Sequence, residues 1–239
     1  RLDSPVKLAW SAPRKEANRI HTNLISYLSL DNSLEDSIDQ LPWRSDTHLR
    51  RCLKQFSGLR LLKQPLEETL LTFLCSATKQ IVQIKQMCEL LAQNIGTEIY
   101  PGIHQLPTWS EIAETSEKRL RKCALGFRAS YIFKVAQFLK EQPKFLEQVK
   151  AFPYALAKER LITLPGVGGK VADCVLLFGA HKQEAFPVDT WIAKTLEKRY
   201  HLSGWDKKQL TQFGQIHFGQ HAGLAQQYLF AWERANQKK

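Results

Sequence analysis

Residues 161–200 read LITLPGVGGKVADCVLLFGAHKQEAFPVDTWIAKTLEKRY, and this stretch decides the fold. An apolar segment that ends near Leu164 is followed by Pro165-Gly166-Val167-Gly168-Gly169, and a second apolar segment begins near Lys170. Glycine tolerates positive φ and lets a backbone approach another molecule closely. The pattern therefore predicts two helices that are joined by a tight, glycine-rich hairpin.

The hairpin is suited to binding an anion. Backbone amides of such a turn and of the following helix N-terminus point outward and favour a phosphate group. We therefore expect Gly166, Val167, Gly168 and Gly169 to contact a DNA backbone without reading its sequence. A nucleotide-binding P-loop is excluded, because it needs four residues between its glycines and a Lys-Ser/Thr pair. The alternative is a simple helix cap and turn.

Two ionisable residues of this stretch suggest chemistry. Lys170 opens the second helix, where the helix dipole disfavours a cation and so favours the neutral amine that a nucleophile requires. Asp189 follows Pro187-Val188 at a position suited to a helix N-cap. A carboxylate there could stabilise positive charge on the C1′ atom of a deoxyribose and help to activate the amine. The alternatives are a phosphate-binding surface lysine and an ordinary helix cap.

The rest of the chain is predicted to be all-α. Apolar residues recur three and four positions apart between Leu24 and Ile38 and between Leu66 and Leu74. Further helices are expected over about 80–95, 109–115, 117–124, 128–140, 144–150, 153–163, 170–180, 190–200, 206–218 and 221–235. Val6–Trp10 alternates as a single strand would, but no convincing pair of strands occurs.

Composition and charge narrow the class of protein. Apolar residues make up 44% of the chain and charged residues 24%, as in soluble globular proteins. No apolar run reaches the roughly 18 residues of a membrane span, and no signal peptide is apparent. The first 50 residues carry seven basic and seven acidic side chains, so the net charge of +11 lies in the remainder, with basic residues concentrated over 118–134. Such an excess favours a nucleic acid partner.

The cysteines favour a reducing compartment. Five of them stand at positions 52, 75, 88, 123 and 174, an odd number with wide spacing and no Cys-x-x-Cys pair. This pattern argues against a disulfide framework and against a zinc or iron–sulfur site. We therefore expect an intracellular protein that needs no metal and no cofactor.

The motif residues resemble those of the helix-hairpin-helix-Gly/Pro-Asp glycosylase superfamily, and within it the eukaryote-type 8-oxoguanine DNA glycosylases. The resemblance covers about residues 27–239. Five further segments fall in family order: Tyr27-Leu28-Ser29-Leu30-Asp31, Gly58-Leu59-Arg60-Leu61-Leu62, Phe73-Leu74-Cys75-Ser76, Leu125-Gly126-Phe127-Arg128-Ala129 and Ala222-Gly223-Leu224-Ala225-Gln226. The resemblance implies a helical fold with two subdomains that follow an N-terminal segment, residues 1–26. One subdomain comprises residues 27–62 and 180–239, and the other comprises residues 63–179.

The resemblance also implies an activity. Lys170 would attack C1′, expel the damaged base and form a Schiff base that permits β-elimination, with Asp189 as electrostatic and acid/base partner. The base must first be flipped out of the duplex. Phe230 and Cys174 would contact its two faces, and Gln226 would bind its Watson–Crick edge. Each of these three could instead be an ordinary core or helix residue.

Three features depart from the family pattern. Lys79, Gln80 and Gln83 replace an Asn-Asn pair and an Arg that contact the orphaned cytosine. Arg128, by contrast, matches the side chain that enters the gap opposite the flipped base, with a phosphate contact as the alternative. Trp191 replaces a His next to Asp189. About 26 residues precede the matching region, too few for the N-terminal β-domain of larger members. Either this domain has been removed and the segment is a remnant of it, or lesion recognition uses another group.

The expected partner is double-stranded DNA with a damaged base, bound by a monomer with no membrane association. Two alternatives remain. A glycosylase for another damaged base, such as an alkylated purine, generally lacks the lysine, and the thymine-glycol and adenine-mismatch enzymes carry four C-terminal cysteines. A non-catalytic helix-hairpin-helix module needs neither Lys170 nor Asp189.

Overall fold

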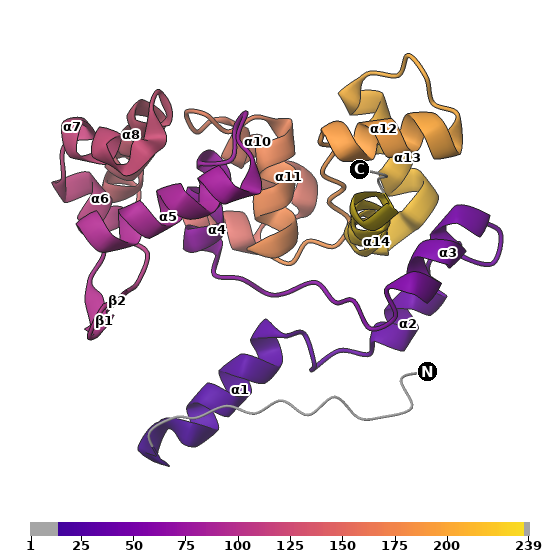
Figure 1. Cartoon of the computed structure of the whole chain (residues 1–239), viewed down its shortest axis with the longest axis horizontal. Helices are drawn as coiled ribbons and strands as arrows, with labels where there is room; N and C mark the ends of the chain where they lie inside the picture. The colour runs from indigo at the N-terminus through magenta and orange to yellow at the C-terminus, as the bar shows by residue number, and fades with distance from the viewer. Residues whose placement is uncertain (1–13, 237–239) are drawn as a thin grey trace. The chain divides into compact units, whose positions relative to one another are not determined.

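The computed structural model describes residues 14–236, and nearly all of their regular structure is helical (Figure 1). The all-α prediction is therefore confirmed. The strand predicted for Val6–Trp10 lies outside the described residues. Contacts divide the chain into a continuous unit, Gln64–His181, and a split unit made of the residues up to Lys63 and from Lys182 onward. The boundaries suggested by the sequence, after residues 62 and 179, are still a prediction.

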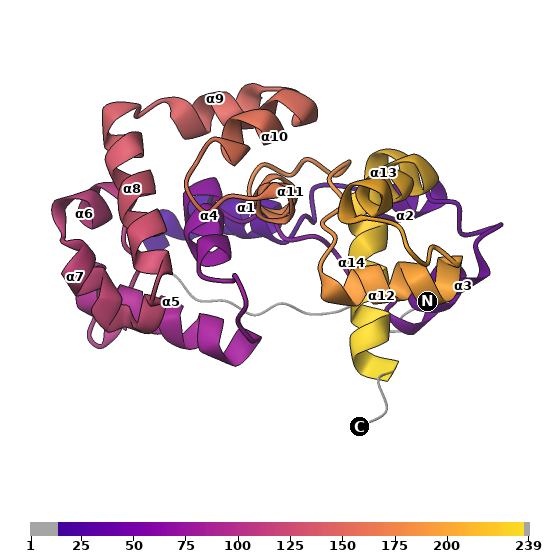
Figure 2. The same cartoon turned by 90° about the horizontal axis from the view of Figure 1, so that it is seen from above.

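The continuous unit contains eight of the α-helices in the described part of the chain: α4 (Leu66–Leu74), α5 (Ile81–Ile95), α6 (Trp109–Glu114), α7 (Glu117–Leu120), α8 (Arg128–Glu141), α9 (Phe145–Ala151), α10 (Tyr154–Ile162) and α11 (Gly169–Phe178). Helix α4 packs against α8, α9 and α11, and α10 packs against α9 and α11 (Figure 2). Every residue of α11 from Ala172 to Leu177 is buried, so this helix forms the core of the unit.

The split unit is built from the two ends of the chain. It contains a short 3-10 turn (Arg14–Glu16), α1 (Ala17–Tyr27), α2 (Leu34–Asp39), α3 (Thr47–Gln55), α12 (Thr190–Tyr200), α13 (Lys207–Phe218), a second 3-10 turn (Gly219–His221) and α14 (Ala222–Asn236). Helix α14 packs against α3, α12 and α13. The fully buried Tyr228 of α14 donates a hydrogen bond of 3.0 Å to the Leu59 carbonyl, so residues far apart in sequence share one core.

One strand pair corrects the expectation that none would occur. Strands β1 (Glu98–Tyr100) and β2 (Ile103–His104) pair antiparallel around Pro101-Gly102. Gly102 has φ +76°, and its amide donates to the Glu98 side chain at 2.8 Å. A proline followed by a glycine of positive φ is typical of a tight turn. Strands of two and three residues are too short for alternation to reveal them.

Two predicted helices are interrupted by left-handed residues. The segment from Leu24 to Ile38 forms the end of α1 and all but the last residue of α2, and Ser29 at φ 52° lies between the two helices. The stretch 117–124 forms α7 and then a π-type turn (Arg121–Leu125), in which Ala124 has φ 59°. Apolar spacing alone does not reveal such breaks, because neither position carries a glycine or a proline.

A buried polar cluster ties α3, α12 and α13 together. Asp46 is 8% exposed, and its Oδ1 accepts a hydrogen bond from the Leu49 amide at 2.8 Å. Its Oδ2 accepts from the Tyr200 hydroxyl at 2.8 Å and lies 3.0 Å from His217 Nε2. Burial alone would raise the pKa of Asp46, but the bonds with His217, Leu49 and Tyr200 outweigh it and lower this pKa below 3.8.

We predict that Asp46→Ala lowers the free energy of unfolding by about 2–4 kcal/mol, because the buried Leu49 amide and the half-buried Tyr200 and His217 side chains lose their partner. Chemical denaturation at neutral pH measures this loss. Because the pKa of Asp46 is depressed in the folded protein, the ionised group stabilises above pH 3.8 and its contribution fades as the pH falls further. Asp39→Ala, at an exposed carboxylate, is the control and should cost less than about 0.5 kcal/mol. Equal losses in the two variants would contradict the prediction.

Candidate active site

The glycine-rich hairpin forms as the sequence predicts. Helix α10 ends at Ile162, the Leu164 amide donates to the Leu161 carbonyl at 3.0 Å, and the Val167 amide donates to the Leu164 carbonyl at 3.1 Å. Gly168 caps α11, which begins at Gly169. The first amides of α11 are therefore presented at the tip of a tight turn, the arrangement that favours an anion.

The glycines of the hairpin have different roles. Gly166 has φ +79°, and a Cβ there would lie 2.8 Å from the Tyr131 ring of α8. Gly166 therefore makes the turn and its close packing possible. At Gly168 and Gly169 a Cβ would meet nothing within 4 Å, and both residues are exposed. Bare backbone at these two positions serves no packing need of the continuous unit and leaves room for another molecule.

This contrast predicts opposite outcomes for two alanine variants. Gly168 has φ −91° and ψ 176°, which alanine adopts readily, so Gly168→Ala should leave the thermal midpoint unchanged while it weakens DNA binding. Gly166→Ala should lower stability by about 1–3 kcal/mol, because it combines left-handed strain with a clash. Thermal denaturation and fluorescence anisotropy with a short duplex measure the two effects. Wild-type DNA affinity in Gly168→Ala would contradict the assignment of that glycine to phosphate binding.

Lys170 lies in the first turn of α11 and is half-buried. Its Nζ lies 5.0 Å from the centre of the Phe73 ring, and Phe73 stacks on Phe178 with 5.7 Å between ring centres. No Asp or Glu of the continuous unit forms an ion pair with it within 4.0 Å. The amine thus lies over an aromatic face in the first turn of the helix that follows the hairpin.

Asp173 of α11 connects the two helices of the hairpin through hydrogen bonds to α10. The sequence analysis assigned no role to this residue. Its carboxylate is 1% exposed and accepts hydrogen bonds from the Tyr154 hydroxyl at 2.6 Å and from Lys158 Nζ at 2.9 Å. Burial raises the pKa of Asp173, although Lys158 and Tyr154 oppose this rise. The contacts lock α10 to α11. The sequence does contain a signal for this role, because Asp173 is the one charged residue within the apolar stretch 171–178 and a buried carboxylate needs partners.

Asp189 caps α12. Its Oδ1 accepts from the Trp191 amide at 3.0 Å and from the Ile192 amide at 2.8 Å, so the orientation of the carboxylate is fixed. Nearby in the same unit, the Gln226 side-chain nitrogen of α14 donates to the Pro187 carbonyl at 3.1 Å. The split unit therefore ties Gln226 to the corner that carries Asp189.

The remaining predicted pocket residues lie on two helices. Phe230 follows Gln226 by one turn of α14, is half-buried, and has the Arg234 guanidinium 5.5 Å from its ring centre. Gln226 is 4% exposed, and its Oε1 accepts from Gln227 at 2.6 Å. Cys174 is 4% exposed and belongs to α11, one turn after Lys170. The helical spacing places Phe230 on the Gln226 face of α14 and Cys174 on the Lys170 face of α11.

Arg128 is buried rather than presented to solvent. It is 2% exposed, and it donates hydrogen bonds to the carbonyls of Leu125 and Ala77 and to the Thr78 hydroxyl. The residue therefore supports the loop between α4 and α5, and a DNA contact requires these bonds to open. Lys79, Gln80 and Gln83 are exposed in this loop and in the first turn of α5, where the Gln83 side chain accepts from the Gln80 amide at 3.2 Å.

Two kinds of feature are absent from the part of the chain that the structure describes. None of its helices has the length and apolar character needed to cross a lipid bilayer. Among residues 14–236 there is also no cluster of three or more His, Cys, Asp or Glu side chains with metal-binding geometry.

Two family models match consecutive parts of the chain. The model described as "HhH-GPD superfamily base excision DNA repair protein" matches residues 71–215. The model described as "8-oxoguanine DNA glycosylase, N-terminal domain" matches residues 6–70. The similarity thus begins further upstream than residue 27, where the sequence motifs placed its start.

Curated relatives carry one activity in their names. The "N-glycosylase/DNA lyase" of Saccharomyces cerevisiae is 33% identical over 199 residues, which are 77% of this chain and 52% of the relative. The "N-glycosylase/DNA lyase OGG1" of Arabidopsis thaliana is 30% identical over 230 residues, 90% of this chain and 62% of the relative. The chain therefore spans about half to three fifths of the length of these relatives.

Solved structures show the same architecture. The 8-oxoguanine glycosylase/lyase of Clostridium acetobutylicum, in complex with double-stranded DNA containing cytosine opposite 8-oxoguanine, superposes with a TM-score of 0.86 at 31% identity over 94% of this chain and 77% of that one. The 3-methyladenine DNA-glycosylase of Archaeoglobus fulgidus gives a TM-score of 0.76 at 22% identity over the same shares of the two chains, a similarity of fold alone.

Proposed function

Because this chain belongs to the HhH-GPD superfamily of base excision DNA repair proteins, we propose that it is a DNA glycosylase and AP lyase that removes 8-oxoguanine from duplex DNA. The observation that carries the proposal is Lys170. Its amine lies at the start of α11, directly after the anion-binding hairpin, over an aromatic ring and without a carboxylate partner in its own unit. The names of the relatives support the same activity.

In the proposed reaction, the target nucleotide leaves the stack and Lys170 attacks its C1′ atom. A carbon–nitrogen bond to the lysine forms while the glycosidic bond to the base breaks, and opening of the sugar gives a Schiff base. Removal of a proton from C2′ then allows the C3′–oxygen bond to break, which cleaves the strand. The protein's own amine supplies the nucleophile, so the proposal requires no metal and no cofactor.

Asp189 is proposed as the electrostatic and acid/base partner. Both hydrogen bonds that it accepts from α12 use Oδ1. Its Oδ2 makes no further hydrogen bond within the described residues of the split unit, so a second acceptor of fixed orientation is available. A preorganised carboxylate stabilises the positive charge that develops at C1′ without reorganisation during the reaction.

Recognition is assigned to two further groups of residues. We propose Cys174, Gln226 and Phe230 as the pocket for the flipped base, and Gly166, Val167, Gly168 and Gly169 as the phosphate-binding turn. Lys79, Gln80, Gln83 and Arg128 are proposed to contact the opposite strand, with Arg128 released from the α4–α5 loop on binding. The same proposal describes a monomer that works on double-stranded DNA inside the cell.

Borohydride trapping tests the function directly. The full chain is incubated with a duplex containing one 8-oxoguanine opposite cytosine, and with the matched undamaged duplex, in the presence of sodium borohydride. Reduction of the Schiff base should yield a covalent protein–DNA adduct with the damaged duplex only. An adduct with another damaged base and none with 8-oxoguanine would favour the alternative glycosylase. DNA binding with no adduct for any lesion would favour a non-catalytic module.

The proposed role of Gln226 predicts a change in discrimination. Gln226→Ala should lower the ratio of damaged to undamaged duplex affinity about tenfold, the value of one specific hydrogen-bonded contact, while affinity for undamaged DNA stays near wild type. Competition binding with the two duplexes measures the ratio. The matched control is Gln215→Ala, because it removes a half-buried side-chain amide from α13 of the same unit, where it donates to the Glu184 carbonyl at 3.1 Å. A ratio unchanged from wild type would contradict the pocket role.

A further inference from the structure

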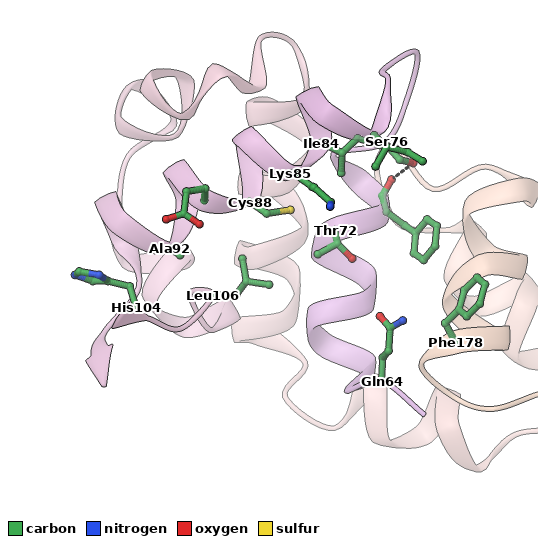
Figure 3. Close-up of a pocket in the computed structure, with 13 residues that line it drawn as sticks. Gln64, Thr72, Ser76, Ile84, Lys85, Cys88, Ala92, His104, Leu106 and Phe178 are labelled. Atoms are coloured by element: carbon green, nitrogen blue, oxygen red, sulfur yellow. Dashed lines mark hydrogen bonds between the residues drawn. The ribbon is translucent and has the colours of Figure 1, made fainter. Parts of the chain in front are cut away.

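A pocket of about 780 Å³ opens within the continuous unit, among α4, α5, β2 and the end of α11 (Figure 3). Phe73 and Phe178, the stacked rings that support Lys170, form one part of its wall. Lys85 and Cys88 of α5 form another part. The proposed reaction uses none of the α5 residues that line this pocket.

Two cysteines meet at this wall. Cys75 caps the C-terminus of α4 and is fully buried, whereas Cys88 lies on α5, is half-buried and lines the pocket. Figure 3 shows the Cys88 side chain pointing from α5 towards α4. The two thiols are in hydrogen-bonding contact, with Cys75 as donor and the Cys88 sulfur as acceptor. A small molecule in the pocket can therefore reach Cys88, whereas the fully buried Cys75 does not line the pocket.

The contact gives the two cysteines different roles: Cys88 is the nucleophile, and Cys75 is the resolving thiol. The hydrogen bond from Cys75 lowers the pKa of Cys88, although burial opposes this, and the same bond together with burial raises the pKa of Cys75. An accessible thiolate with a second thiol in contact is the arrangement of redox-sensitive cysteine pairs.

Neither of two other buried thiols competes for this role. The Cys123 thiol donates to the Leu90 carbonyl at 3.5 Å, and burial raises its pKa. Cys52 belongs to the split unit, and burial raises its pKa to about 12. Both are therefore held as unreactive thiols.

We propose that Cys88 and Cys75 form a reversible oxidation site that responds to hydroperoxides entering the pocket. The Cys88 thiolate attacks the peroxide, the oxygen–oxygen bond breaks, and Cys88 sulfenic acid and hydroxide (or an alcohol) are formed. The Cys75 thiol then attacks that sulfur, so a disulfide forms and water leaves. The peroxide is reduced by two electrons, and the two thiols are oxidised. A thiol reductant reverses the step.

The disulfide would change the loop that follows α4. A disulfide holds its sulfurs about 2.05 Å apart, much closer than a thiol hydrogen bond, so Cys75 and α5 must approach each other. Ala77 and Thr78, which bind Arg128, follow Cys75 by two and three residues. The loop also carries Lys79 and Gln80. Since these residues are proposed to contact DNA, we expect oxidation to weaken DNA affinity about tenfold; this consequence rests on the proposed function.

The oxidation itself is tested without DNA. The full chain is treated with a small excess of hydrogen peroxide, quenched with catalase, denatured and alkylated, and then digested without reductant. Mass spectrometry should find the Cys75 and Cys88 peptides joined, and thiol counting should show two of the five thiols lost and recovered after dithiothreitol. Alkylation of both cysteines to the same extent before and after peroxide would overturn the proposal, as would a disulfide between any other pair.

Variants separate the two roles and the two proposals. Cys75→Ser should leave Cys88 as a sulfenic acid that dimedone traps, Cys88→Ser should form neither product, and Cys123→Ser should behave like the wild type. Loss of the disulfide in Cys123→Ser would overturn the assignment of the pair. If the disulfide forms but DNA affinity does not change, the link to the loop is overturned and the oxidation site stands. A chain that forms the disulfide but never traps on 8-oxoguanine DNA would refute the proposed function alone.

Discussion

Lys170→Gln is expected to abolish both base release and strand cleavage, with a rate at least about a thousandfold below wild type, while DNA binding survives. Glutamine has a similar length but no nucleophilic amine, so no Schiff base can form. The variant keeps the hairpin, because Gly166, Gly168 and the Asp173 contacts with α10 do not involve the Lys170 side chain. DNA should therefore still bind to the phosphate-binding turn.

Single-turnover assays on a duplex with one 8-oxoguanine measure base release and strand cleavage separately, and anisotropy measures affinity. The matched control is Lys140→Gln, which removes an exposed lysine from α8 in the same unit and should retain full activity. Base release by Lys170→Gln at the wild-type rate would refute the covalent mechanism. Base release without strand cleavage would show that a water, rather than the amine, displaces the base.

Asp189→Asn should reduce base excision about a hundredfold while the thermal midpoint stays close to wild type. Asparagine keeps a side-chain oxygen for the Trp191 and Ile192 amides, and it is as good an N-cap as aspartate. It loses the negative charge that the proposed mechanism needs at C1′, and such electrostatic and acid/base contributions are worth roughly 10²–10⁴ in rate. The substitution therefore separates the cap from the chemistry.

Asp189→Ala completes the comparison. It removes both the charge and the cap, so it should lose about 1 kcal/mol of stability in addition to the activity. Thermal denaturation measures the midpoint of each variant, and single-turnover kinetics measures its rate of base excision. Full activity in Asp189→Asn, or equal stability of the Asn and Ala variants, would contradict one half of the assignment.

The hairpin could be predicted from sequence because its determinants are local. Gly166 stands where φ is +79°, and α10, α11 and α12 begin or end within two residues of their predicted limits. Helix α3 was missed for an equally local reason. Its sequence, THLRRCLKQ, is rich in charge and buries only Leu49 and Cys52, so the apolar repeat is short. Its clearest signal is the Asp46 cap, which the apolar pattern does not contain.

What sequence reasoning missed depends on residues that are distant in the chain. Asp173 contacts Tyr154 and Lys158, which are 19 and 15 positions away. Arg128 binds Ala77 and Thr78, about 50 positions away, so a residue predicted to face DNA is buried in the absence of DNA. The residue pattern picked out Lys170 and Asp189, and the family resemblance added their roles. A single sequence does not specify, however, which distant side chains form hydrogen bonds with each other.

The split unit has a consequence for how the chain folds. Tyr200 reaches Asp46 across 154 positions, Tyr228 reaches Leu59 across 169, and Asn236 reaches Gln55 across 181. The continuous unit has all of its helices once His181 has left the ribosome, whereas α3 must wait for α14 before its buried face is covered. Loops of such length close slowly and leave apolar surface exposed meanwhile. Co-translational folding should therefore begin in the continuous unit, and α3 should be completed only when α14 has been synthesised.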